Sequence, residues 1–346
     1  MEQITWETLG YENFFQTQTI GEETPLGRIT KAGNGLYTIQ TPEKAFSGKI
    51  SGRYCFDAEV QGDFPCVGDW VLFQPQAGED KAIIHQRLER RTLLTRHAAG
   101  NTHQEQVMAA NIDYVWIVSS MDQDLNLRRI ERYLMQVYES GAVPVIILTK
   151  ADLAPDPERQ VAAVERIAPG VSVYSVNTLQ GVGCDSLIEK FAPGMTIALI
   201  GSSGVGKSTL INRLVGKTVQ KTQEVREEDH KGKHTTTHRE MFLVPGGPLI
   251  LDTPGMRELQ LWGVSDGVQS TFSDIEDYSS QCKFRDCSHG SEPGCAVKQA
   301  IKDGRLTEER LKNYWKMQRE IERLDLKSKY GAHKTNRILH SPKSKK

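Results

Sequence analysis

The sequence has few cysteines, no long apolar run and almost no net charge, and each deficiency excludes a class of protein. Six cysteines in 346 residues are too few for a disulfide scaffold. No apolar stretch approaches the roughly 18 residues of a membrane-spanning helix. The first ten residues lack the basic and then apolar pattern of a secretory signal. We therefore expect a cytoplasmic protein with no membrane partner, in which clustered cysteines form metal or redox sites.

Charge is balanced over the whole chain but not at its two ends. Lys and Arg total 43 against 44 Asp and Glu, so the overall charge does not indicate a nucleic-acid-binding protein. Residues 1–27 contain five acidic side chains and no basic one, whereas residues 326–346 contain seven basic side chains and no acidic one. The C-terminal end is either a basic interaction tail or a solvated segment.

Three patterns follow one another after an N-terminal extension over residues 1–27, and they predict three domains. Residues 28–95 contain five short β segments separated by turn residues: Arg28–Lys31, Leu36–Gln40, Lys49–Arg53, Trp70–Gln74 and Ala82–Arg87. Five short strands so close together predict a small barrel, such as an oligonucleotide-binding (OB) fold, or else another small β domain.

Residues 96–265 alternate buried strands with helices, which predicts an α/β domain with a doubly wound sheet. Tyr114–Ser119 and Val143–Leu148 are unbroken apolar runs, as strands buried on both faces should be.

Residues 266–346 contain a Cys/His cluster, a charged helix from about Glu308 to Leu326 and the basic end. The scattered cysteines are expected to be core residues; they are Cys55, Cys66 and Cys184.

A phosphate-binding loop is the strongest motif. Residues 201–208 match G-x-x-x-x-G-K-[ST] between a predicted strand and a predicted helix. Backbone N–H groups of such a loop surround phosphates, Lys207 adds a positive charge and the Ser208 hydroxyl binds Mg²⁺. The loop predicts a nucleoside triphosphate site made by Gly201, Ser202, Ser203, Gly204, Val205, Gly206, Lys207, Ser208 and Thr209.

Two further motifs suggest which nucleotide binds. Asp252 ends a strand and can reach the magnesium shell, while the N–H of Gly255 can meet the γ-phosphate. A second strand is followed by Thr149, Lys150, Ala151 and Asp152. The Asp152 carboxylate can accept two hydrogen bonds from guanine that adenine cannot donate, which favours GTP. The GTPase consensus has Asn at the position of Thr149. An ATP-using enzyme with a phosphate-binding loop is the alternative interpretation of these motifs.

The order of these motifs is permuted. In ordinary GTPases the phosphate loop comes first and the base-recognition motif last, whereas here Asp152 precedes the loop and the loop precedes Asp252. The sequence therefore predicts a circularly permuted GTPase domain, which is tolerable because domain termini usually lie close together. The segment after Asp252, which senses the γ-phosphate, then runs directly into the C-terminal domain.

The segment 223–240, between the phosphate loop and Asp252, is dense in charge and contains two further candidates. Met256 stands where many GTPases have a water-orienting Gln, so another group must orient the water. His234 is the candidate, because an imidazole titrates near neutral pH; it can equally be an ordinary loop histidine. Thr236 is the candidate for a second magnesium ligand.

A metal site is predicted in the C-terminal region. Three cysteines and one histidine lie within 14 residues; they are Cys282, Cys287, His289 and Cys295. Three thiolates and one imidazole form a closed structural Zn²⁺ site, which would hold together a loop that buries little apolar surface. Unligated or redox-active cysteines are the alternative.

In combination, the permuted motifs, the preceding barrel and the following Cys₃His cluster resemble the ribosome small subunit-dependent GTPase A (RsgA) family over about residues 28–330. The resemblance implies a GTP hydrolase, binding GTP and GDP, that acts late in assembly of the small (30S) ribosomal subunit. It implies that the barrel and zinc domains contact 16S rRNA, that the subunit stimulates a slow hydrolysis, and that His234 acts in catalysis beside Lys207. We expect a monomer. A GTP-gated RNA-binding regulator outside ribosome assembly is the alternative.

Overall fold

The N-terminal part of the chain forms a closed β-barrel. The computed structural model describes residues 3–97, 105–216, 219, 239–252 and 265–339. The barrel strands pair in the order β1-β2-β3-β5-β4, and β4 returns to β1. Only β3 and β5 run parallel among these five strands. This closed five-stranded barrel confirms the predicted fold; the strands are β1 (Leu26–Gly33), β2 (Leu36–Gln40), β3 (Ala45–Ile50), β4 (Trp70–Pro75) and β5 (Lys81–Arg87).

The third strand of the barrel lies earlier than predicted. β3 ends at Ile50, and the predicted strand over 49–53 instead runs into helix α2 (Gly52–Asp57). The reason is local, because the Ser51 hydroxyl accepts a hydrogen bond from the Tyr54 N–H and caps the helix. Cys55 lies on this helix and is exposed, so the prediction that it is a core residue was wrong. Cys66 and Cys184 are buried as expected.

The acidic N-terminal extension packs on the barrel. It contains α1 (Asn13–Gln16) and a 3₁₀ turn, η1 (Thr17–Thr19). The rings of Trp6, Tyr11 and Phe15 surround the buried Trp70 of β4, with centroids 5.1 to 6.2 Å from its ring. The extension therefore covers an apolar surface of the barrel with aromatic side chains.

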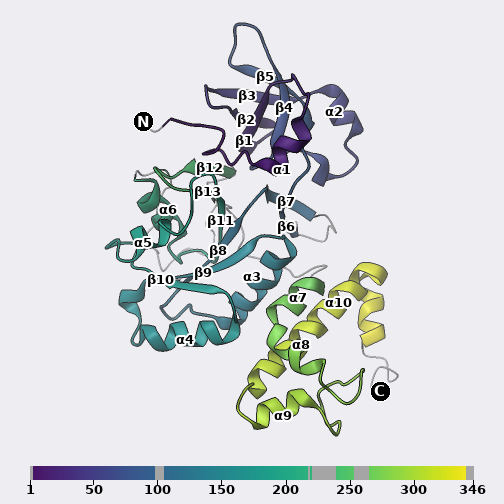
Figure 1. The fold of residues 1–346 in the computed structure, drawn as a ribbon. Helices are drawn as coiled ribbons and strands as arrows, with labels where there is room; N and C mark the ends of the chain where they lie inside the picture. The colour runs from purple at the N-terminus through teal and green to yellow at the C-terminus, as the bar shows by residue number, and fades with distance from the viewer. Residues whose placement is uncertain (1–2, 98–104, 217–218, 220–238, 253–264, 340–346) are drawn as a thin grey trace.

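A second set of strands forms the mainly parallel sheet in the middle of the molecule (Figure 1). Its order is β10-β9-β8-β11-β13-β12, and only β12 is antiparallel to its neighbour in this set. The apolar runs are buried on both faces, as predicted. The strands are β8 (Tyr114–Ser120), β9 (Val143–Thr149), β10 (Ser172–Ser175), β11 (Thr196–Ile200), β12 (Arg239–Leu243) and β13 (Leu249–Asp252).

Helices cover both faces of this sheet, which makes it doubly wound. One core contains side chains of α3 (Leu127–Glu139) and α4 (Pro157–Ile167). The other contains side chains of α5 (Cys184–Ile188) and α6 (Lys207–Val215). The alternation of strands and helices in the sequence produces this arrangement because each strand needs an apolar helix face on both sides.

The barrel and the central sheet are joined by backbone pairing and by a buried arginine. β1 pairs with β12, so the two sheets are continuous. Arg28 is 1% exposed, and its guanidinium donates to the carbonyl oxygens of Leu9, Gly68 and Asn111. Burial lowers the pKa of Arg28 to about 10, which leaves it charged at neutral pH. Beside this junction lie η2 (Gln61–Asp63) and the hairpin β6 (Leu93–His97) and β7 (Glu105–Ala110).

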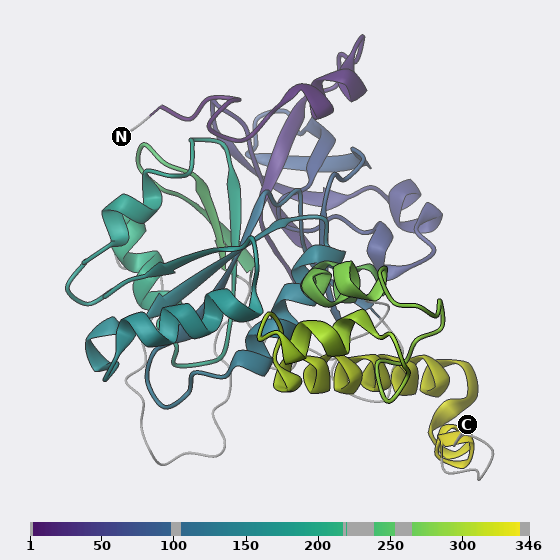
Figure 2. The same cartoon turned by 60° about the horizontal axis from the view of Figure 1, so that its bottom comes forward.

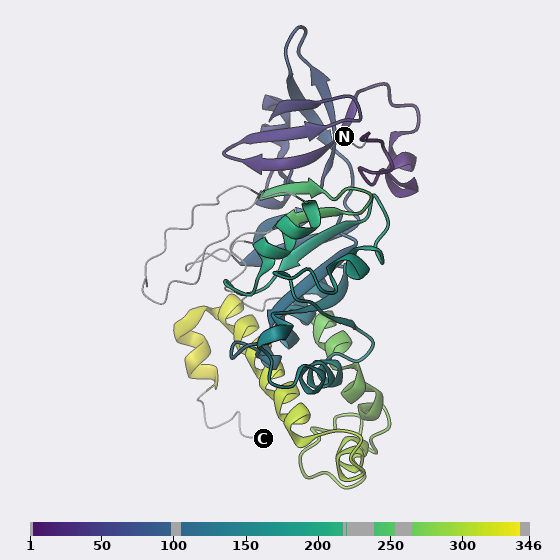
Figure 3. The same cartoon turned by 90° about the vertical axis from the view of Figure 1, so that its left-hand side faces the viewer.

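The C-terminal region is helical and packs against α3. Its core contains Phe272, Ile275, Val297, Leu311 and Tyr314. Its helices are α7 (Ser265–Thr271), α8 (Ser273–Ser279), α9 (Ala296–Lys302) and α10 (Glu308–Leu339), so the last helix extends well past its predicted end at Leu326. Figure 2 shows the length of α10, and Figure 3 shows barrel, sheet and helices following one another. None of the helices in the described ranges has the length and hydropathy of a membrane span.

One prediction concerns the close approach of backbone at the barrel junction. Gly68 has φ +95°, and a Cβ there would lie 2.0 Å from the Ala110 carbonyl oxygen. Gly35, in the β1–β2 turn, has φ +72° but nothing within 4 Å. Gly35→Ala should cost about 1 kcal/mol of unfolding free energy from backbone strain alone, and Gly68→Ala about 3 kcal/mol or more because of the additional clash. Equal losses in chemical denaturation would contradict the close approach.

Candidate functional site

The phosphate-binding loop lies between β11 and α6, as the sequence predicts. β11 ends at Ile200 and α6 begins at Lys207, with Gly206 at its N-cap. Gly201 is required by space, because a Cβ there would lie 2.2 Å from the Val118 carbonyl oxygen. Helix α6 begins directly after the loop, and the N–H groups at the start of a helix stabilise an anion.

Two opposite charges meet at this loop. The Lys207 ammonium donates to the carbonyl oxygens of Gly201 and Ser202 at 2.7 and 2.5 Å. Asp252 ends β13, is 8% exposed and is paired in register with Leu199 of β11. Burial raises the pKa of Asp252, and the nearby Lys207 opposes that rise. A buried carboxylate beside a lysine and a helix N-terminus suits a site for phosphate and a hard cation.

The predicted base-recognition segment touches the phosphate loop. Thr149 is fully buried at the end of β9, and its hydroxyl donates to the Val205 carbonyl oxygen at 2.5 Å. The single hydroxyl that replaces the consensus amide thus bonds to the loop itself. Ala151 and Asp152 follow in a 3₁₀ turn, η3 (Ala151–Leu153), in which Asp152 is exposed.

Sequence reasoning missed two residues at this edge. The Lys150 ammonium lies 2.8 Å from the Asp122 carboxylate, which follows β8. Partial burial raises the pKa of Asp122. Hydrogen bonds from Lys150, the Asp124 N–H and Ser120 together lower this pKa by more, so the net shift is downward. Arg129 of α3 donates to the Ser202 hydroxyl at 2.6 Å. The only feature of the sequence that could have pointed to Asp122 as a site residue is its position directly after a parallel strand. Nothing in the sequence around Arg129 indicates that it reaches the phosphate loop.

Several predicted site residues are not placed. His234, Thr236 and Gly255 lie outside the described residues. Ser208 and Thr209 lie in the first turn of α6, directly after Lys207. The nucleotide-binding and magnesium-binding roles of the predicted residues stay predictions.

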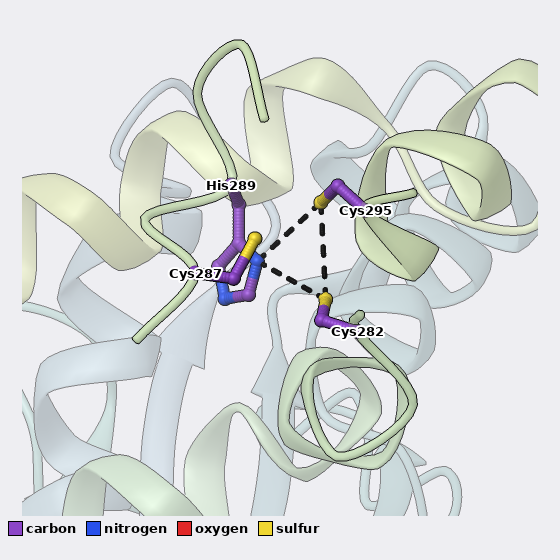
Figure 4. A group of neighbouring side chains, drawn as sticks. All are labelled: Cys282, Cys287, His289 and Cys295. Atoms are coloured by element: carbon purple, nitrogen blue, oxygen red, sulfur yellow. Dashed lines mark hydrogen bonds between the residues drawn. The ribbon is translucent and has the colours of Figure 1, made fainter. Parts of the chain in front are cut away.

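The predicted metal ligands come together in the C-terminal region (Figure 4). The ligand atoms of Cys282, Cys287, His289 and Cys295 all lie within 4.8 Å of one another. His289 Nδ1 is 3.5 Å from the Cys295 sulfur and 3.7 Å from the Cys282 sulfur. Its Nε2 lies 3.2 Å from the Ser279 hydroxyl, so Nδ1 is the nitrogen that faces the cluster. These four residues could bind a metal ion.

Backbone N–H groups support a thiolate in this cluster. The Lys298 N–H, in the first turn of α9, donates to the Cys295 sulfur at 3.4 Å. Burial raises the pKa of Cys282, but hydrogen bonds from the Val297 and Ala296 N–H groups bring the net shift downward. Helix N-termini stabilise negative charge in this way, and a thiolate is the form that binds metal.

Comparisons with known proteins agree with this geometry. A family model described as RsgA GTPase matches residues 87–262. A protein of Methanosarcina acetivorans named Small ribosomal subunit biogenesis GTPase RsgA is 45% identical over 305 residues, which cover 88% of this chain and 82% of the relative. Small ribosomal subunit biogenesis GTPase RsgA 2 of Listeria monocytogenes is 43% identical over 318 residues, which cover 92% of this chain and 90% of the relative.

Two solved structures share the fold. YjeQ from Thermotoga maritima is 26% identical with a TM-score of 0.65, over 84% of this chain and 96% of that chain. YloQ, described as a circularly permuted GTPase, is 27% identical with a TM-score of 0.63, over 87% and 96%. These matches confirm the permuted order that was inferred from the motifs. With its barrel, permuted sheet and Cys₃His cluster, the chain belongs to the RsgA family of GTPases.

Proposed function

We propose that this chain hydrolyses GTP on the small ribosomal subunit late in its maturation. The observation that carries the proposal is the hydrogen bond from the Thr149 hydroxyl to the Val205 carbonyl oxygen. It holds the end of β9, which the predicted guanine-recognition residue Asp152 follows, against the phosphate loop despite the permuted order. The names of the relatives specify biogenesis of the small ribosomal subunit, which supplies the partner.

The residues of the loop provide electrostatic stabilisation. Lys207 would exchange its bonds to the Gly201 and Ser202 carbonyls for phosphate oxygens, and the N–H groups at the start of α6 would face the charge that develops during phosphoryl transfer. The Gly255 N–H would face the γ-phosphate, and His234 would orient the attacking water. Ser208 and Thr236 would hold Mg²⁺, which would neutralise phosphate charge; hydroxyl and carboxylate oxygens are the donors that such a hard cation prefers.

The Cys₃His cluster fits a structural zinc site. Four ligands leave no open position for catalysis, and tetrahedral Zn²⁺ prefers thiolate and imidazole donors. The ligands span the segment between α8 and α9, so a bound ion would fix that loop. We assign the cluster a role in holding the C-terminal region together.

The chain divides into parts with different roles in this proposal. Residues 28–95 form the barrel part and residues 266–346 the zinc part, and both contact 16S rRNA; residues 96–265 hydrolyse GTP. The seven basic residues after 326 favour RNA phosphates as their partner. Residues 1–27 support the barrel through the aromatic contacts to Trp70. The chain acts as a monomer in the cytoplasm, where its ribosomal partner is.

The first functional prediction tests base recognition. Asp152→Asn should weaken GDP binding at least about tenfold, because two charge-assisted hydrogen bonds to guanine are lost. It should strengthen binding of xanthosine diphosphate, whose C2 carbonyl can accept from the new amide. The matched control is Asp80→Asn, an exposed barrel residue paired with Lys44. Unchanged GDP affinity, or ATP competing as well as GTP with the wild type, would favour an ATP-using enzyme.

The second prediction tests the metal. The purified protein should contain about one zinc ion per chain. Cys282→Ser should remove most of this zinc and lower the melting temperature, whereas Cys55→Ser, outside the cluster and exposed, should change neither. Elemental analysis and thermal melting give the two readouts. Full zinc content in the Cys282 variant would exclude the cluster as the zinc site.

The third prediction tests the partner. Isolated small ribosomal subunits should raise the rate of GTP hydrolysis by far more than threefold, and large subunits should not. An increase below about threefold, which is under ~0.7 kcal/mol of barrier, would favour the GTP-gated regulator instead.

A further inference from the structure

Helix α3 belongs to two packed cores. Ile130, Leu134 and Val137 contribute to the core under the central sheet. Met135 is fully buried in the core of the C-terminal helices, together with Phe272 and Leu311. At the same place α7 approaches very closely, because a Cβ on Gly267 would lie 2.3 Å from the Met135 carbonyl oxygen. A movement of the C-terminal helices therefore acts directly on α3.

Buried charges fix the C-terminal side of α3. Arg310 of α10 is 5% exposed and donates to the Glu131 carboxylate, which is 0% exposed, at 2.7 Å. The same guanidinium donates to the Asp274 carboxylate at 3.0 and 3.1 Å and to the Thr271 carbonyl oxygen at 2.7 Å. Arg310 thus binds α3 to both α7 and α8. Buried charge pairs of this kind tolerate little change in geometry.

The opposite side of α3 reaches the phosphate loop. Arg129 donates to the Ser202 hydroxyl at 2.6 Å and to both oxygens of Asp124 at 2.7 and 3.2 Å. The carbonyl of Ser202 is in turn a partner of the Lys207 ammonium. The position of Arg129 is therefore transmitted to Lys207 through one residue.

We propose that Arg129 is a positioning residue for GTP hydrolysis, which links the phosphate loop to the C-terminal helices through α3. Arg129 and Glu131 are two positions apart, about 200° around the helix, so they face opposite sides. Rotation or sliding of α3 must therefore change the Arg129–Ser202 contact and the Glu131–Arg310 contact together. The C-terminal helices then set the geometry of the loop without touching nucleotide. The inference rests on the proposed function only in that the loop binds and hydrolyses GTP.

The side chains of the Arg129–Asp124 pair are partly exposed, so folding depends little on this pair. The side chains of Arg129 and Asp124 are 35% and 45% exposed, and ion pairs that exposed contribute little to stability. A purely structural role would therefore predict small effects of Arg129 variants on melting and on turnover alike. A positioning role predicts a small effect on melting and a large one on turnover.

The test uses the full chain and starts with steady-state kinetics. Arg129→Ala should lower kcat for GTP about tenfold or more while KM changes less than about threefold, with the melting temperature nearly unchanged. Arg129→Lys should give an intermediate kcat, because one ammonium cannot hold Ser202 and Asp124 in the same fork. Arg128→Ala is the matched control, since Arg128 is the exposed neighbour. An unchanged kcat in Arg129→Ala would overturn the positioning role.

A double-mutant cycle tests the link through α3. Glu131→Gln keeps an acceptor for Arg310 but removes the charge, and should lower kcat about threefold in the wild-type background. In the Arg129→Ala background it should have almost no further effect, because the transmitting contact is already lost. Independent effects that multiply in the double variant would overturn the link.

Hydrogen exchange separates failure of this inference from failure of the proposed function. Binding of GDP or of a non-hydrolysable GTP analogue should slow exchange in residues 308–320 of α10 in the wild type, and less so in Arg129→Ala. This readout does not depend on turnover, so it decides the link even if the wild type hydrolyses no GTP. Protection of the phosphate loop in the wild type would show that nucleotide binds; equal protection of α10 in both proteins, or none in α10 while the loop is protected, would overturn the link.

Discussion

Parallel pairing in the central sheet is the constraint on which the site depends. β11 lies between β8 and β13, and β8 lies beside β9. The carboxyl ends of parallel strands share one edge whatever their order in the chain. Thr149, the phosphate loop and Asp252 therefore meet at that edge, although the motifs occur in permuted order. Permutation changes the connections between strands and keeps the surface that the nucleotide would contact.

The sheet lies between the barrel and the C-terminal helices (Figure 3). The segment after Asp252 leads to the C-terminal helices, which also hold α3 through Arg310. The barrel is joined to the sheet by the β1–β12 pairing and by Arg28. A buried guanidinium requires all of its carbonyl partners, so it ties the extension, the barrel and the sheet together. The sheet is thus attached to two parts that differ in composition.

The sequence predicted the barrel, the doubly wound sheet and the convergence of the four Cys/His side chains correctly, because their signals are local. Strand periodicity, a loop of eight residues and four ligands within 14 residues can all be recognised without knowing the fold. The sequence pattern placed β3 too late in the chain, because the Ser51 helix cap outweighs strand propensity after Ile50. It assigned no role to the N-terminal extension, because the aromatic partner of Trp6 and Phe15 is Trp70, far along the chain.

By itself the sequence indicated the chemistry of the two predicted sites, since most of the residues that would contact phosphate and bind metal are nearly contiguous. Only the tertiary structure decided what α3 connects. Helical periodicity places Arg129 and Glu131 on opposite sides, but it does not say that Ser202 lies opposite one and Arg310 opposite the other. Those partners are 73 and 179 residues away in the chain. Contacts over such separations are set by how the sheet and the C-terminal helices pack, which no local pattern encodes.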